Sequence, residues 1–250
     1  MAGSRVLPQA KSIGDGRCII LEPYFIFKGI NSKEMGILIS AMPDIMKPQR
    51  REAEITIPGR NGVLTIDEGT YEAYTLSVAC GTRGTARLRE IVSWLDGNGD
   101  LILSTEPDKI YKARICNAIS ISDVIYLYTS FLVQFKVFPF KYSVDKADEE
   151  LTLTSPTTIY NQGTIYSEPI ITVNGTGNVT ITINGTTYTL TGISGYVTIN
   201  SEIQEVYKDS TNKNNSFSAL DFPRFQEGGN TISWTGNVSR LEIKPNWRWL

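Results

Sequence analysis

Residues 85–96 are the one stretch of this chain with a clear helical period, and most of the rest alternates with period two. The apolar stripe consists of Leu88, Ile91, Val92 and Leu95. Thr85 is the expected N-cap, and Gly97 or Gly99 is the expected left-handed residue after the helix. A lone helix in a β-rich chain has to bury its stripe against a sheet. We therefore expect a mainly β fold in which this helix packs on the sheet of an N-terminal domain.

The composition argues against most enzyme chemistry. The 250 residues include no histidine, which excludes Ser-His-Asp and Cys-His catalysis and His-ligated zinc. Cys18, Cys80 and Cys116 are too few and too widely spaced for a disulfide framework or a zinc site. We expect no catalytic residue, no metal and no cofactor. A carboxylate-based glycosidase survives as a third hypothesis, although nothing beyond the presence of acids favours it.

Charge and hydropathy limit the partners. The formal net charge of −2 gives no electrostatic reason to expect nucleic-acid binding. No apolar run reaches the roughly 18 residues of a membrane span, so we expect no membrane insertion.

Changes in composition and in hydrophobic period divide the chain into four segments. Residues 1–22 are rich in small residues without a period, and we treat them as a leader that is disordered, derived from an expression vector or an unusual native extension. Residues 23–143 form the expected N-terminal β domain. Residues 144–158, charged and then threonine-rich, are the expected linker. Residues 159–250 carry short Thr/Ile/Val strands with Asn-Gly turns, which is typical of a β-sandwich.

A charged hairpin is predicted within the N-terminal domain. Residues 52–57 and 63–67 are extended runs on either side of residues 58–62, which contain an Asn-Gly pair. Two interpretations remain open: a solvated hairpin, or a loop that contacts a neighbouring subunit. For the second, the candidate contact residues are Arg50, Arg51, Arg60, Asn61 and Asp67.

Trp234, Trp247 and Trp249 are the candidates for ligand binding in the C-terminal half. An indole face suits stacking on a sugar or a base, and Arg248 lies between two of the indoles in sequence. Alternatively, these tryptophans fill the core of the sandwich.

A set of short segments also occurs in an order typical of one family. The segments in the first half are residues 24–30, 35–37, 94–103 and 106–114. Those in the second half are residues 196–201, 205–207, 212–215, 221–223, 230–234 and 247–250. Over residues 23–250 the chain resembles the distal tail proteins of long, non-contractile-tailed phages (siphophages).

The resemblance implies a tail-tube-like N-terminal β domain, a sandwich or split barrel with one helix, followed by a galectin-like β-sandwich. It implies a structural virion protein at the distal end of the tail, synthesised in the bacterial host cytoplasm. Six copies would close into a homo-hexameric ring, the baseplate hub, through whose lumen DNA passes without specific binding. The implied partners are the tail tube protein, the tail-tip (tail-associated) protein and a receptor-binding protein active in host adhesion.

The resemblance does not extend to sugar binding, because the galectin site relies on a histidine and this chain has none. The arm-like insertions of some relatives are also missing, which weakens the expectation of direct docking by a receptor-binding protein. The alternative function is a carbohydrate-binding module that recognises host cell-wall saccharide through the three tryptophans named above.

Overall fold

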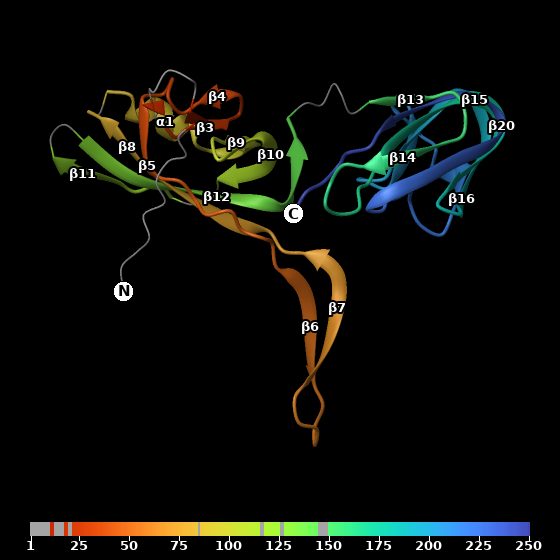
Figure 1. The fold of residues 1–250 in the computed structure, drawn as a ribbon, viewed down its shortest axis with the longest axis horizontal. Helices are drawn as coiled ribbons and strands as arrows, with labels where there is room; N and C mark the ends of the chain where they lie inside the picture. Colours follow the sequence, from red (N-terminus) through yellow and green to blue (C-terminus); the bar gives the residue numbers. More distant parts are fainter. Residues whose placement is uncertain are drawn as a thin grey trace. The chain divides into compact units, whose positions relative to one another are not determined.

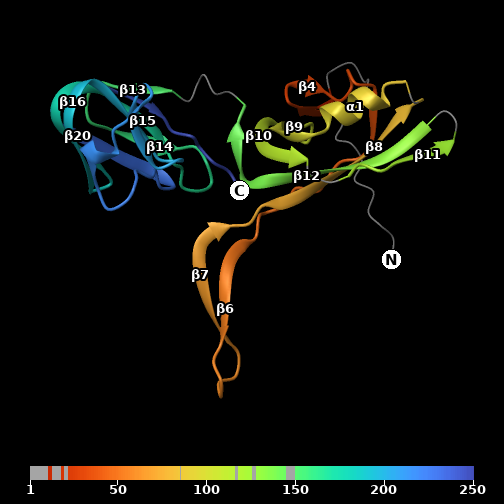
Figure 2. The same ribbon diagram turned by 180° about the vertical axis from the view of Figure 1, so that it is seen from behind.

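The structure, a computed structural model, describes residues 11–12, 18–19, 22–84, 86–115, 118–125, 128–144 and 150–250. The chain divides into two compact units, Met1–Lys141 and Tyr142–Leu250 (Figures 1 and 2). Both are built from β-strands, and α1 (Leu88–Trp94) is the one α-helix within the described ranges. The predicted mainly β fold with one helix is confirmed.

The N-terminal unit is centred on an eight-stranded sheet with the order β4-β3-β9-β10-β12-β8-β5, to which β11 adds by pairing with β12. Its strands are β3 (Phe25–Phe27), β4 (Ile30–Asn31), β5 (Ile37–Ala41), β8 (Tyr74–Arg83), β9 (Gly97–Leu103), β10 (Glu106–Ile115), β11 (Ile121–Ile125) and β12 (Tyr128–Ser143). In β12, Phe131, Val133, Phe135 and Val137 alternate into the core. The opposite face of β12 exposes Leu132 and Phe138, so this strand is covered on one face only within the unit.

Helix α1 covers the core face of this sheet, but its orientation differs from the predicted one. Trp94 is buried, stacks on Phe25 with ring centroids 5.6 Å apart, and donates its indole N–H to the Phe27 carbonyl oxygen. Ile91 and Leu95 are buried as predicted, whereas Val92 is 45% exposed. The prediction for Val92 was wrong because the larger indole occupies the core-facing position.

The ends of the helix also differ from the prediction. The helix begins at Leu88, after an N-cap at Arg87 that makes no side-chain capping hydrogen bond. The predicted N-cap Thr85 lies outside the described residues. Gly97 has a φ of +68° at the start of β9, in keeping with its predicted left-handed conformation.

The predicted hairpin is present as a separate two-stranded sheet of β6 (Arg50–Thr56) and β7 (Val63–Tyr71). It extends from the eight-stranded sheet of the same unit as a ribbon (Figure 1). Ile55 pairs with Leu64 and Ala53 pairs with Ile66 across the ribbon. The connection is longer than a two-residue turn, since residues 57–62 separate the strands.

The C-terminal unit holds a second eight-stranded sheet with the order β13-β20-β15-β16-β17-β18, plus β14 on β20 and β19 on β16. Its strands are β13 (Leu151–Leu153), β14 (Thr157–Asn161), β15 (Ile170–Ile183), β16 (Thr186–Asn200), β17 (Glu205–Lys208), β18 (Thr211–Asn212), β19 (Phe217–Ser218) and β20 (Gly228–Lys244), with a 3-10 helix at Asn214–Ser216.

Two glycines, Gly175 and Gly236, allow the backbones of β15 and β20 to approach closely. The β15–β20 register is irregular around Gly175. A Cβ on Gly175 would lie 2.3 Å from the Asn237 carbonyl oxygen, and one on Gly236 would lie 2.4 Å from the Asn178 carbonyl oxygen. Glycine is therefore needed where the two strands approach. The bent sheet encloses a core that includes Ile171, Ile181, Leu190, Ile199 and Phe225.

The segments at the predicted domain limits are described only in part. Within the predicted leader, β1 (Lys11–Ser12) pairs with β2 (Cys18–Ile19), and the other residues before Glu22 lie outside the described ranges. Within the predicted linker, β13 and the first residues of β14 pair with β20, so those residues belong to the C-terminal sheet. The two compact units meet in sequence between Lys141 and Tyr142.

Candidate assembly interface

The β6–β7 ribbon has two chemically different faces. Residues paired directly across two antiparallel strands lie on the same face, and successive residues alternate between faces. The pairs Ile55–Leu64 and Ala53–Ile66 therefore make one apolar face. The pairs Glu52–Asp67, Glu54–Thr65 and Thr56–Val63 make the opposite face, which is mostly acidic and polar. We call these the apolar face and the acidic face of the hairpin.

The apolar face is open to solvent. Ile55, Leu64 and Ile66 are 44%, 42% and 47% exposed, and Ile57 next to them in the loop is also exposed. A two-stranded hairpin is marginally stable in water unless another element covers it. Contiguous exposed aliphatic side chains on one face are typical of a protein–protein contact. The ribbon therefore presents an exposed aliphatic surface.

The base of the hairpin is fixed by polar contacts. Arg50 Nη1 lies 2.6 Å from Asp67 Oδ2, and the Arg50 guanidinium lies over the Tyr71 ring at 5.3 Å. The Gly69 backbone N–H donates to Asp67 Oδ1 at 2.8 Å. That N–H, followed by the Arg50 guanidinium, lowers the pKa of the Asp67 carboxyl below its usual value. These contacts join β6 to β7 at the base of the hairpin.

The structure divides the predicted ring-contact residues into two groups. Arg50 and Asp67 meet at the base, and Arg51 is exposed beside them. Arg60 and Asn61 lie in the distal loop, where the Arg60 N–H donates to the Ile57 carbonyl oxygen. The prediction rested on charge and therefore missed the apolar face. The signal was present in the sequence as the period-two positions 53, 55, 64 and 66.

The ligand-stacking prediction for the tryptophans is wrong for Trp247. This side chain is 3% exposed and packs in the C-terminal core, with its ring centroid 5.8 Å from that of Phe225. Trp234 and Trp249 are partly buried against the same core. Trp247 thus packs in the core, the second of the two interpretations left open by the sequence, while ligand stacking by Trp234 and Trp249 stays a prediction.

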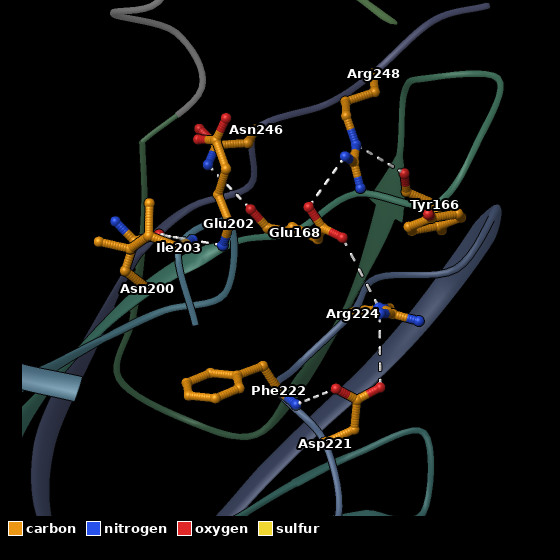
Figure 3. A network of polar contacts seen from close by, with 10 residues as sticks. All are labelled: Tyr166, Glu168, Asn200, Glu202, Ile203, Asp221, Phe222, Arg224, Asn246 and Arg248. Carbon is orange, nitrogen blue, oxygen red and sulfur yellow. Dashed lines mark hydrogen bonds and ion pairs between the residues drawn. The ribbon is translucent and has the colours of Figure 1, made fainter. Parts of the chain in front are cut away.

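The C-terminal segment is held by a polar network around Glu168 (Figure 3). The buried Arg248 places Nη1 3.1 Å from Glu168 Oε2 and donates from Nε to the Tyr166 carbonyl oxygen. Asn246 Nδ2 donates to the Glu168 carbonyl oxygen, and Arg224 Nε lies 3.9 Å from Glu168 Oε1. Glu168 is thereby engaged with two guanidinium groups. This arrangement anchors the end of the chain.

Three features of the described residues bear on catalysis and metal binding: metal-ligand groups, reactive thiols and pockets. Within those ranges, no group of three or more Cys, Asp or Glu side chains is placed to hold a metal ion. Burial raises the pKa of the Cys80 thiol to about 12, which keeps it protonated and a poor nucleophile at neutral pH. A shallow open depression on α1 is lined by Leu88, Arg89, Val92 and Ser93. Among helices in the described ranges, none is long and apolar enough to cross a bilayer.

Comparison with known proteins gives a match in structure. No family model matches the chain, and no curated protein matches it. A solved structure that matches is the crystal structure of the SPP1 Dit (gp 19.1) protein, described as a paradigm of the hub adsorption apparatus in phages that infect Gram-positive bacteria. The match has a TM-score of 0.70 at 15% sequence identity, and covers 91% of this chain and 99% of that one. The chain therefore shares the fold of the SPP1 Dit protein over most of its length, in line with the fold that the sequence resemblance implied.

Proposed function

We propose that this chain is a structural virion protein, the hub at the distal end of a phage tail. Two observations support the proposal: the likeness in fold to the SPP1 Dit protein and the uncovered apolar face of the β6–β7 hairpin. In this role the chain assembles by surface complementarity and carries out no chemical turnover.

The proposed assembly is a homo-hexameric ring. A ring requires a heterologous contact, in which one surface of a copy meets a different surface of the next and the rotation closes. The hairpin supplies one such surface, because Ile55, Leu64 and Ile66 are 44%, 42% and 47% exposed and β6 and β7 pair only with each other among the described strands. Burying aliphatic side chains against a neighbour would favour association by about 25 cal/mol per Å² of apolar surface.

The ring would join the tail tube protein to the tail-tip protein, with a receptor-binding protein as a further partner. DNA would pass through the lumen without specific binding. The chain would reside in the virion after synthesis in the host cytoplasm. The alternative function is a carbohydrate-binding module, which would have to use Trp234 and Trp249, since Trp247 is buried.

A matched pair of variants tests the hairpin contact. Ile66 and Val63 are each 47% exposed on the same strand, but they lie on opposite faces of the ribbon. Ile66→Ser is expected to abolish ring formation, seen by negative-stain electron microscopy and by particle mass, while Val63→Ser leaves it intact. Equal behaviour of the two variants would contradict a contact made by the apolar face.

A coarser test removes the distal loop. Shortening residues 58–62 is expected to weaken assembly, because the loop carries Arg60 and Asn61 beside the exposed Ile57. Circular dichroism would verify that the shortened chain keeps its β structure. Unchanged ring assembly in a folded, shortened chain would rule out the loop as a contact.

A further inference from the structure

The hairpin base is joined to the end of β12 by an aromatic contact. Tyr71, the last residue of β7, meets the edge of Phe140 with ring centroids 5.7 Å apart at 74°. Arg50 lies on the Tyr71 ring and is held by Asp67. Phe140 is buried, so this edge-to-face pair connects the exposed ribbon to an interior position.

The next residue along β12 is anchored in a different way. Lys141 is buried, its Nζ lies 3.0 Å from Glu106 Oε1, and it sits 5.6 Å from the centre of the Tyr111 ring. The Tyr111 hydroxyl donates to Glu106 Oε2. Burial, together with this hydrogen bond, raises the pKa of Tyr111, so the phenol remains a donor at neutral pH. A buried ion pair is strongly position-specific, because leaving either charge unpaired is costly.

The regular alternation of β12 stops at these two residues. Val137 is buried and Phe138 is exposed, but Pro139, Phe140 and Lys141 are all buried. Phe140 engages the hairpin base, and Lys141 engages the start of β10. The second compact unit begins at the following residue, Tyr142, so both contacts act on the strand where it leaves the N-terminal unit.

We propose that the hairpin base and the exit of β12 form one coupled element. The side-chain contacts run from Asp67 through Arg50 and Tyr71 to Phe140, and the backbone of β12 joins Phe140 to Lys141, which contacts Glu106. Holding the hairpin, as a bound partner would, stabilises the strand segment that leads into the second unit. Coupling of this kind is reciprocal, so loosening the β12 exit also loosens the hairpin base. The inference concerns the isolated chain and does not depend on the proposed ring.

Amide hydrogen exchange on the full-length chain tests the coupling from the hairpin side. Tyr71→Leu removes the ring contact, and exchange of residues 138–143 is expected to become about threefold to tenfold faster. Exchange of Val133, in the middle of β12, is expected to stay unchanged. Tyr160→Leu is the matched control, because Tyr160 is exposed on β14 of the other unit.

The reciprocal experiment acts on the β12 exit. Tyr111→Phe deletes the hydroxyl that donates to Glu106 while keeping the ring beneath Lys141, which makes it gentler than removing either charge. Exchange of residues 50–54 and 67–71 is expected to become about threefold faster, with Tyr160→Phe as the control.

The Tyr71→Leu and Tyr111→Phe experiments together test the proposed coupling. Faster exchange at the far end in both variants, with Val133 unaffected, supports the coupling. Changes confined to the mutated side in either variant would overturn it. A rise at Val133 equal to that at the far end would also overturn it, because it would report a general loss of stability.

Discussion

Two hairpins in this molecule share one sequence pattern and have opposite surroundings. β15–β16 and β6–β7 both alternate aliphatic residues around an Asn-Gly pair. In β15–β16 the turn is Asn184-Gly185, with φ values of +51° and +84°, as a type I′ turn requires. There Ile181 is 0% exposed, whereas Ile66 of β7 is 47% exposed. The same alternation thus fills a core in one unit and faces water in the other.

The difference arises from what lies beside each hairpin. β20 pairs with the free edge of β15, and the bent sheet encloses the aliphatic face. The strands β6 and β7 pair only with each other among the described strands. Alternation of aliphatic and polar residues predicts that one face of the strands will be buried. It does not say whether the element that buries this face comes from the same chain. For β6–β7, the proposed function makes another copy of the chain that element.

The largest loss of stability in the C-terminal unit is expected from a substitution at Trp247. Trp247→Ala removes a buried indole that packs against Phe225 and should lower the free energy of unfolding by about 3–5 kcal/mol. Urea denaturation followed by circular dichroism measures this loss. Tyr160→Ala, at an exposed position of the same unit, should cost within about 0.5 kcal/mol. A small effect of Trp247→Ala would mean that the indole is not part of the core.

The two hairpins are compared directly by one truncation in each. Ile181→Ala should lower the free energy of unfolding by about 2–5 kcal/mol, because it opens a cavity in a sealed core. Ile66→Ala should change the stability of the unassembled chain by less than about 0.5 kcal/mol. Denaturation at low protein concentration measures both values. Similar losses in the two variants would show that the β6–β7 face is covered within the chain.

Two glycine-to-alanine substitutions compare how closely the backbone is packed in the C-terminal sheet and in the β6–β7 loop. Gly236 has a φ of +101° and no room for a Cβ, so Gly236→Ala should cost more than about 2 kcal/mol. Gly62, in the hairpin loop, has a φ of +81° and nothing within 4 Å of an added Cβ. Gly62→Ala should therefore carry only the left-handed backbone penalty of about 1 kcal/mol. Thermal denaturation ranks the two, and the reverse order would contradict the close approach of β15 and β20.

Low pH should destabilise the base of the β6–β7 hairpin and leave the β15–β16 hairpin unchanged. The pKa of Asp67 is lowered in the folded chain, so its contribution to stability is present above its ordinary value near 3.8. That contribution is lost as the pH falls through the lowered pKa and Asp67 becomes protonated. Hydrogen exchange of residues 50–54, corrected for the intrinsic pH dependence, should rise below about pH 4 relative to that of β15. In Asp67→Asn this relative rise should disappear; its persistence would assign the acid response to another group.

Much of the fold could be predicted from local patterns. The hairpin β6–β7, the turn at Asn184-Gly185 and helix α1 follow from periods and turn residues that act over a few positions. The C-terminal strands are longer than the predicted short ones, since β15 continues through Asn174-Gly175. The helix face was only partly predictable, because Trp94 competes with Val92 through a stack on Phe25, far away in sequence. The capping prediction at Thr85 remains untested, since that residue lies outside the described ranges.

The candidate interface was harder to predict because it depends on relations between residues that are distant in sequence. Charge drew attention to Arg50 and Asp67, which turn out to bind each other at the hairpin base. The exposure of Ile55 and Ile66 depends on the absence of a neighbouring strand among the described residues, which no local pattern encodes. The contact of Lys141 with Glu106 joins residues that are distant in sequence, and neither residue carries a local sign of its partner.

The particle mass of the purified chain tests the central claim most directly. One chain has a mass of 27.8 kDa, so a closed ring of six has a mass of about 167 kDa. Light scattering after size exclusion, over a concentration series, is predicted to show this mass, or twice this mass if two rings stack. The Ile66→Ser variant is predicted to elute as a monomer. A wild-type particle of 27.8 kDa at every concentration would contradict an assembly that the hairpin drives by itself.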